Sequence, residues 1–388
     1  MSRTLAALLG AAAGAVALVG IVIIFLWFCL SRDRNISRTS ETGSSDPSIQ
    51  VGRVELPLTG TFGSLPPDSR EARRFLMEEL ALATKDFNDI NLIGEGKFGK
   101  VYKGLLHDGM IVAIKKRNGL PSQEFFEEVR YLSSIRHRNI VSLLGYCQEN
   151  DQQMIIYEYI PNGSVSSHLY GTSQVSREKL EFKHRLSIAL GAAKGLSHLH
   201  ALSPRLIHKG FKTVNVLVDE NFIAKVADAG LYNLLARVDV AGSSFGIMAD
   251  DAFLAPEVRE FRRFSEKSDV YSFAVFLLEL VSGHEAMKSQ SSESGENIVE
   301  WARNYDDSSN ISTIIDPRLG NSFTTEGMKE FIQLTVRCLD HSSERRPSMN
   351  FVVGELDRIL EKEMSLTTIM GEGTTTVTLG SHLFTATR

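Results

Sequence analysis

Cysteine is scarce in this chain, and neither an excess of positive charge nor an internal repeat is present. Only three of the 388 residues are cysteines, namely Cys29, Cys147 and Cys338. Because they lie far apart and leave an odd count, the sequence indicates neither a disulfide framework nor a zinc site, and it favours a reducing compartment for most of the chain. The formal net charge of -5 gives no basic field, so we expect no nucleic-acid partner.

Charged residues are also absent from residues 4–30. This run predicts one transmembrane helix, because about 27 residues at ~1.5 Å each can span a ~30 Å hydrocarbon core. A cleaved signal peptide is the alternative, although the run is about twice the length expected for one. Only Arg3 precedes the run, whereas Arg32, Arg34 and Arg38 follow it. The positive-inside rule therefore places the C-terminal side in the cytoplasm.

Gly10 and Gly14 enclose three alanines within this run. A GxxxG spacing lets helix backbones approach closely and favours helix pairing, but an ordinary Ala/Gly-rich span explains it equally well. Residues 1–3 would be the only part outside the cell. A signal from outside would then have to arrive through a partner protein.

The rest of the chain divides by composition. Residues 31–74 are rich in Ser, Thr, Gly and Pro, which predicts a flexible linker. Residues 75–84 have helical apolar spacing and open a folded domain that we place at 75–360. The 43% hydrophobic content is enough for a large core in this domain. Residues 361–388 predict a flexible tail.

Several ordered motifs occupy the predicted domain. Residues 94–101 read GEGKFGKV, which fits a glycine-rich loop, and residues 112–115 (VAIK) supply a lysine at the expected spacing. A glycine motif alone is weak evidence, but this series at the correct separations argues strongly against a chance match. The further elements are residues 125–129 (FFEEV), Lys212 with Asn215, Asp228-Ala229-Gly230, and Ala255-Pro256-Glu257.

These motifs resemble those of the protein kinase superfamily and, within it, the plant receptor-like kinases. The closer likeness rests on residues 136–141 (RHRNIV), 157–164 (YEYIPNGS), 268–273 (SDVYSF) and 345–349 (RRPSM). The resemblance implies an α+β, bilobal protein kinase fold with a small β-rich lobe, a large helical lobe and a cleft for ATP with Mg²⁺ or Mn²⁺. We expect strands of the small lobe at 111–114, 143–147 and 154–157.

The resemblance also implies which residues hold ATP. Glycines let backbone N–H groups approach the phosphates, and Lys115 supplies a cation for the α- and β-phosphates. Glu128 would hold Lys115 by an ion pair, with Glu127 and Glu124 as alternatives. The implied cofactor-binding residues are Gly94, Gly96, Gly99, Val101, Ala113, Lys115, Glu128, Glu158, Tyr159, Asn215 and Leu217.

Other residues have implied roles outside ATP recognition itself. Asn215 and Asp228 would ligate the metal ion through oxygen. Glu257 would pair with Arg346, and Asp269 would hold the backbone of the catalytic loop. The last two roles indicate the fold and say nothing about turnover.

The catalytic base of this family is missing. Residues 208–210 read His-Lys-Gly where a protein kinase carries His-Arg-Asp, so Gly210 replaces the carboxylate that accepts the substrate proton. General-base catalysis typically contributes about 10²–10⁴-fold, and phosphoryl transfer depends mainly on positioning, so slow transfer is an alternative to none. Lys212 is retained, but the set of catalytic residues is not intact.

Three more positions depart from the family pattern. Ala229 replaces a phenylalanine that packs between the lobes, a loss of about 3–5 kcal/mol unless neighbours refill the volume. Asp250 stands where we expect threonine, and we predict that it pairs with Lys212 and closes the peptide cleft. Two independent changes tolerated after activity was lost are the alternative. Lys209 replaces arginine and loses its two-pronged grip on phosphate.

The sequence favours a membrane-anchored pseudokinase that binds ATP. It would lie in the plasma membrane with its C-terminal domain in the cytoplasm, and it would regulate or scaffold other membrane receptor kinases or co-receptors. One alternative is a slow Ser/Thr kinase in which water or Asp250 takes the proton. Another is a structural adaptor that binds no nucleotide.

Overall fold

The computed structural model describes residues 72–96, 98–117, 124–170, 180–236, 252–286, 298–305 and 311–370. The predicted transmembrane run with Gly10 and Gly14 lies outside these ranges, as do most of the predicted linker, Asp250 and residues 371–388. Within the described ranges, no helix is both long enough and apolar enough to cross a membrane.

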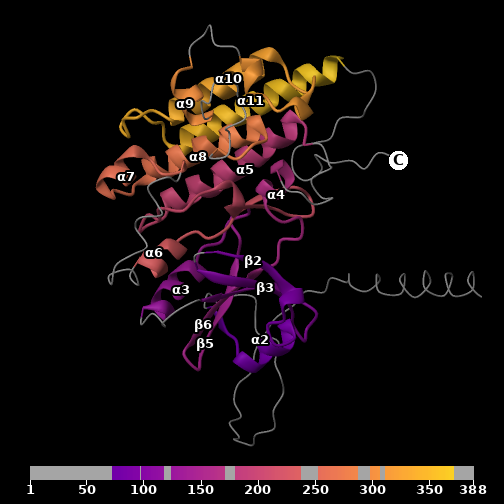
Figure 1. The fold of residues 1–388 in the computed structure, drawn as a ribbon, viewed down its shortest axis with the longest axis vertical. Helices are drawn as coiled ribbons and strands as arrows, with labels where there is room; N and C mark the ends of the chain where they lie inside the picture. Colours follow the sequence, from indigo (N-terminus) through magenta and orange to yellow (C-terminus); the bar gives the residue numbers. More distant parts are fainter. Residues whose placement is uncertain are drawn as a thin grey trace, which may run out of the picture. The chain divides into compact units, whose positions relative to one another are not determined.

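A six-stranded sheet forms the small lobe (Figure 1). Its strand order is β1-β5-β6-β4-β3-β2, and β1 pairs with β5 in parallel. In β4, Val112 and Ile114 are buried in the same cluster as Leu80 of α2, so Ala113 and Lys115 belong to the opposite face of the sheet. The elements are β1 (Arg73–Arg74), α2 (Met77–Thr84), η2 (Asp89–Asn91), β2 (Leu92–Glu95), β3 (Gly99–Leu105), β4 (Ile111–Arg117), α3 (Phe125–Ser133), β5 (Leu143–Glu149) and β6 (Gln152–Glu158).

The folded part is longer than predicted at both ends. Strand β1 lies inside the predicted linker, and Phe75, which follows it, is buried. The contact requires glycine at position 145, because a Cβ atom there would lie 2.1 Å from the Arg73 carbonyl oxygen and 2.5 Å from the Phe75 ring. At the other end, α11 continues to Met370, beyond the predicted boundary at residue 360.

Helices form most of the large lobe. Helix α8 begins with a capping box between Ser265 and Ser268 and ends at Gly283, whose φ of 68° suits glycine. The elements are α4 (Val165–Tyr170), α5 (Phe182–Ala201), η4 (Thr213–Asn215), β7 (Val216–Val218), β8 (Ala224–Val226), α6 (Leu231–Ala236), α7 (Pro256–Phe261), α8 (Glu266–Ser282), α9 (Ile298–Arg303), η7 (Ile311–Thr313), η8 (Pro317–Leu319), α10 (Thr325–Cys338) and α11 (Met349–Met370).

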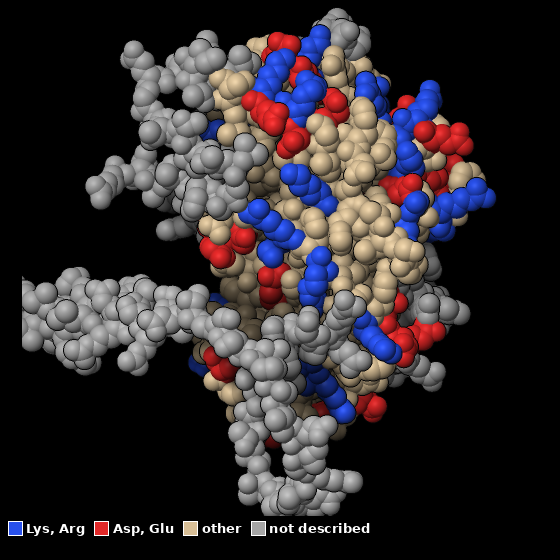
Figure 2. All heavy atoms as spheres, turned by 180° about the vertical axis from the view of Figure 1, so that it is seen from behind, with Lys and Arg blue, Asp and Glu red and all other residues tan. Residues whose placement is uncertain are grey.

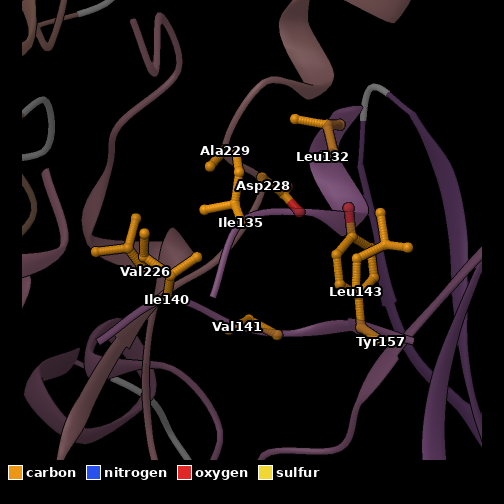
Figure 3. Close-up of a pocket in the computed structure, with 9 residues that line it drawn as sticks. All are labelled: Leu132, Ile135, Ile140, Val141, Leu143, Tyr157, Val226, Asp228 and Ala229. Carbon is orange, nitrogen blue, oxygen red and sulfur yellow. The ribbon is translucent and has the colours of Figure 1, made fainter. Parts of the chain in front are cut away.

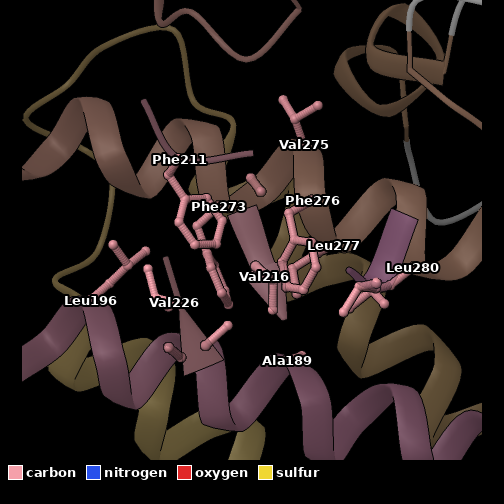
Figure 4. Close-up of a cluster of buried hydrophobic side chains, with 14 of the residues drawn as sticks. Ala189, Leu196, Phe211, Val216, Val226, Phe273, Val275, Phe276, Leu277 and Leu280 are labelled. Carbon is pink, nitrogen blue, oxygen red and sulfur yellow. The ribbon is translucent and has the colours of Figure 1, made fainter. Parts of the chain in front are cut away.

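An aromatic cluster between α5 and α8 anchors the catalytic loop (Figure 4). Phe211, the residue after Gly210, is 1% exposed. Its ring centre lies 5.8 Å from that of Phe273 and 5.6 Å from that of Phe276, both on α8. Because the ring cannot move without disturbing the core, it fixes the backbone of its neighbour Gly210.

Surface charge of the large lobe is mixed in sign. Figure 2 shows basic and acidic side chains next to one another over this lobe. Between α10 and α11, for example, Lys362 pairs with Glu326 at 2.7 Å and with Glu330 at 3.0 Å. Exposed pairs of this kind contribute little to stability.

Candidate functional site

A cavity of about 380 Å³ between the lobes collects most of the predicted nucleotide-binding residues. This volume is in the usual range for small-molecule sites. The sheet supplies one wall, and residues around η4 and β7 supply the other. The predicted residues that line it are Gly94, Gly96, Val101, Ala113, Lys115, Glu158, Tyr159, Asn215, Leu217 and Asp228. Gly99 and Glu128 are not among the lining residues.

Lys115 reaches across the cleft to Asp228. Its Nζ atom lies 2.6 Å from each of the two carboxylate oxygens. Asp228 has a φ of 64°, a strained conformation for a residue with a side chain, which aims its carboxylate at the lysine. The ion pair thus joins β4 of the small lobe to the Asp228-Ala229-Gly230 segment that follows β8 of the large lobe.

Glu128 was the predicted partner of Lys115, but the ion pair in the described part of the chain is with Asp228. Burial, and then the charge of Glu128, raise the pKa of Tyr131, so Glu128 lies near that phenol ring. Lys115 pairs with Asp228 because both carboxylate oxygens of Asp228 lie against the Lys115 ammonium group and compensate the charge of that group.

Asn215 and Asp228 could hold a metal ion between them. The Nδ2 atom of Asn215 donates to the carbonyl oxygen of Gly210 at 2.9 Å, which leaves the side-chain oxygen as its ligating atom. Mg²⁺ commonly takes one or two protein oxygens and completes its shell with water and phosphate, so this pair fits such an ion. A metal at Asp228 would compete with Lys115 for the same carboxylate.

A second cavity of about 220 Å³ extends the cleft to the altered catalytic loop. Gly210, Lys212 and Asn215 line it. A Cβ atom built on Gly210 would have no heavy atom within 4 Å, so a side chain at this position has room. Asp228 is the only acidic residue among the described residues that line this cavity, and it is bound to Lys115.

The loop backbone is held as the sequence predicted. Asp269 accepts hydrogen bonds from the backbone N–H of His208 at 2.8 Å and of Lys209 at 3.0 Å. The predicted pair of Glu257 with Arg346 is confirmed too, with two contacts of 2.7 Å and 2.9 Å. Both contacts stabilise the fold whether or not phosphate is transferred.

Lys209, which stands where the family pattern has arginine, lies beside two aromatic rings. Its Nζ atom is 5.9 Å from the ring centre of Tyr232 and 5.9 Å from that of Phe264. Both distances allow cation–π attraction. Lys212 makes a similar contact, with its Nζ atom 5.8 Å from the Phe253 ring, whereas its predicted partner Asp250 lies outside the described residues.

Ala229 lines a small, largely apolar space (Figure 3), which shares Val141, Tyr157 and Asp228 with the 380 Å³ cavity. The space amounts to about 20 Å³, close to that of a single water molecule. A Cβ atom on the next residue, Gly230, would lie 2.4 Å from a methyl group of Leu132. Leu132 thus packs closely against this segment and lines the same space as Ala229, so little volume beside Ala229 is open.

Tyr157 is one of the residues that line this space (Figure 3), and it also lines the 380 Å³ cavity. Burial, and then the charge of Asp228, raise the pKa of Tyr157 well above its usual value. The phenol is therefore neutral at physiological pH and serves as a wall between the two spaces.

Two side chains near the cleft were missed by the sequence interpretation. Phe98, at the tip of the glycine-rich loop, is 3% exposed and lines the second cavity. Its ring centre lies 5.9 Å from the Nζ atom of Lys115 and 5.9 Å from the Cζ atom of Arg117. The alternation of β4, which puts residues 113, 115 and 117 on one face, was the available signal for Arg117.

A two-lobed fold with a glycine-rich loop, a strand lysine paired to an aspartate and a loop asparagine defines a protein kinase domain. The chain belongs to the protein tyrosine and serine/threonine kinase family, whose model matches residues 87–356. Within that family it groups with the plant receptor-like kinases. The predicted bilobal fold and family are thereby confirmed.

Individual relatives agree with this assignment. The chain is 36% identical over 357 residues to a nodulation receptor kinase of Pisum sativum, which covers 91% of this chain and 38% of that protein. It is 35% identical over 347 residues to the probable serine/threonine-protein kinase PBL21 of Arabidopsis thaliana, which covers 87% of this chain and 88% of the relative. The chain spans less than half the length of the receptor relatives that it matches.

A solved structure is similar as well. The pseudokinase domain of BIR2, an immune regulator of the RLK/Pelle family, matches with a TM-score of 0.60 and 30% sequence identity. The match covers 74% of this chain and 86% of the BIR2 chain.

Proposed function

We propose that this protein is a membrane-anchored receptor-like pseudokinase that binds ATP and regulates or scaffolds an active receptor kinase. The observation that carries the proposal is the contrast within one cleft. Ten predicted nucleotide and metal residues meet around one cavity, whereas the position of the general base holds Gly210 and has no side chain. The residues proposed to bind the nucleotide are thus retained, whereas the residue that would remove the substrate proton is replaced.

Substitution of another base is disfavoured by the described residues. Asp228 is the only carboxylate that they contribute to the cavity beside Gly210, and its oxygens are engaged by Lys115. A general base must reach the substrate hydroxyl within about 2.6–3.2 Å, directly or through one water. The alternative is slow phosphate transfer with Asp250 or water as the base. It requires phosphate transfer by the wild type that is lost when a residue of the proposed phosphate site, such as Lys115, is replaced.

ATP would occupy the larger cavity. The adenine would lie near Val101, Ala113 and Leu217, with the backbone of Glu158 and Tyr159 available for hydrogen bonds. A bound metal ion would supply charge neutralisation of the phosphates, and Asn215 and Asp228 are the residues that would hold it. The side chain of Glu158 accepts from Lys225 at 2.9 Å and from the Ser142 backbone at 2.7 Å, which fixes this connecting segment.

Membrane anchoring and a regulatory role rest on different support. The uncharged run at residues 4–30 is of membrane-spanning length, and several relatives are named as receptor kinases. BIR2 is a pseudokinase and an immune regulator by its description. A protein with this anchor would act on receptor kinases or co-receptors in the plasma membrane.

A melting experiment tests the nucleotide part of the proposal. ATP should raise the melting temperature of the full chain, because a ligand that binds only the folded state adds RT ln(1 + [L]/Kd) to its stability. Lys115→Met should abolish the shift, and its melting temperature without ATP checks that it folds. If ATP protects neither protein, the chain is an adaptor without nucleotide and the proposal fails.

A further inference from the structure

Arg117 is a buried cation with incomplete hydrogen bonding within the described part of the chain. The side chain is 6% exposed, and its Nε and Nη1 atoms have no partner among the described residues. Only one other buried side-chain atom in the described part of the chain is left in this way, Nδ1 of His168. A buried guanidinium without hydrogen bonds is costly, because its hydration is lost and nothing replaces it. Such a group requires an explanation.

Arg117 lies on the same strand as Lys115, which lines the proposed nucleotide cavity. It follows Lys115 by two residues on β4, so both side chains belong to the face of the sheet that covers the cleft. Across the strand pair, Lys115 lies opposite Val101 and Arg117 lies opposite Gly99 of the glycine-rich loop. Two residues of strand advance by about 7 Å, so Arg117 stands beyond Lys115 in the direction of the loop tip.

Arg117 lines neither of the two cavities, whereas its neighbour Phe98 lines the second one. The ring centre of Phe98 lies 5.9 Å from the guanidinium carbon of Arg117. The aromatic face offers cation–π attraction but accepts no conventional hydrogen bond from the guanidinium fork. A modest movement of the loop tip would take the ring away and open the guanidinium to the cleft.

Lys115 shares its positive charge with a carboxylate in this arrangement. Both oxygens of Asp228 lie 2.6 Å from its Nζ atom, so much of its charge is compensated within the protein. Arg117 has no such carboxylate partner among the described residues. A guanidinium also presents a donor fork that matches a phosphate, which an ammonium group does not.

We infer that Arg117 binds the terminal phosphate of a nucleoside triphosphate after Phe98 moves aside. This inference rests on the proposed nucleotide-binding function and adds a residue and a preference to it. Lys115 lies at the inner phosphates, and Arg117 lies further along the same strand under the loop tip. The cleft should therefore prefer ATP to ADP, and part of this preference should persist without a divalent metal ion.

The test compares two charge-removing substitutions on the same strand. Arg117→Met removes the buried cation, and Lys116→Met removes the same charge from the opposite face, where the Nζ atom of Lys116 lies 4.8 Å from the Phe87 ring. Affinities of the full chain for ATP and for ADP are measured by calorimetry, in Mg²⁺ and in EDTA. Arg117→Met should weaken ATP about tenfold and leave ADP within about twofold, because charged hydrogen bonds to one phosphate are lost. Lys116→Met should change neither affinity.

Further variants distinguish a wrong role for Arg117 from a failure of the proposed nucleotide binding. Arg117→Lys should keep part of the ATP preference, and Arg117→Met should melt no lower than the wild type without nucleotide, since an unpaired buried charge is removed. Equal losses of ATP and ADP affinity in Arg117→Met, or no loss, would overturn the role of Arg117 while nucleotide binding stands. If the wild type binds neither nucleotide, the proposed function fails and the role of Arg117 fails with it.

Discussion

Ala229→Phe tests whether the space of the missing phenylalanine is still open. If it were empty, refilling it would recover much of the ~3–5 kcal/mol that a Phe-to-Ala truncation costs. The structure gives the opposite sign, because the space beside Ala229 is only about 20 Å³ and Leu132, which also lines it, has a methyl group 2.4 Å from where a Cβ on Gly230 would be. We therefore expect Ala229→Phe to lower the free energy of unfolding by about 1–3 kcal/mol through overpacking.

Leu132→Ala completes a double-mutant cycle with Ala229→Phe. Alone, Leu132→Ala should cost about 2–5 kcal/mol, because Leu132 is 5% exposed and its removal leaves a cavity. In the double variant the new ring enters that cavity, so the pair should be more stable than the sum of the single effects by about 0.5–3 kcal/mol.

Thermal denaturation of the full chain measures this cycle. A change of 1 kcal/mol shifts the melting temperature by roughly 2–4 °C in domains of 150–250 residues, and somewhat less in a larger one. Ala229→Phe should therefore melt several degrees below the wild type. A higher melting temperature for Ala229→Phe alone, or strict additivity in the double variant, would refute the refilling by Leu132.

Two further predictions concern charged groups of the described structure. Burial, and then nearby positive charges, lower the pKa of His137, and its Nδ1 atom accepts from the Asn139 backbone at 3.1 Å. The stability that neutral His137 contributes is complete above about pH 6.5 and is lost as the pH falls through the lowered pKa of the folded state. Between pH 7.5 and pH 5, the melting temperature should therefore fall less steeply for His137→Asn than for the wild type. Glu257→Gln should cost about 3–5 kcal/mol, because it leaves the fully buried Arg346 side chain without its counter-charge. Exposed Glu260 on the same helix is the matched control, and an equal melting temperature for Glu257→Gln and Glu260→Gln would contradict the role of the ion pair.

Much of the fold could be predicted because its signals are local. The expected strands at 111–114, 143–147 and 154–157 lie within β4, β5 and β6, and α2 occupies residues 77–84 of the helix expected at 75–84. Each of these segments carries its own apolar pattern. Strand β1 has no such pattern in two arginines, and it forms because the chain lies along β5 with Phe75 buried beside Gly145. Only the assembled sheet contains that information.

The site was predictable to the extent that it follows ordered motifs. Ten of the residues that the motifs predicted line one cavity. The motifs do not predict which carboxylate contacts Lys115. That choice depends on the strained backbone of Asp228 and on the placement of α3, which are tertiary properties. Arg117 was missed for a related reason, since its lack of partners becomes visible only when every neighbour is in place.

Phosphate transfer by the wild type and by Gly210→Asp tests the central claim most directly. A Cβ at position 210 meets no heavy atom within 4 Å, so a side chain can begin there without a clash, and residues of the proposed phosphate cradle line the adjoining cavity. The full chain is incubated with labelled ATP, Mg²⁺ or Mn²⁺ and a generic peptide substrate, beside Lys115→Glu as a negative control. The account predicts no transfer by the wild type and measurable transfer by Gly210→Asp. Transfer by the wild type that disappears in Lys115→Glu would contradict it and establish an enzyme with an unusual base.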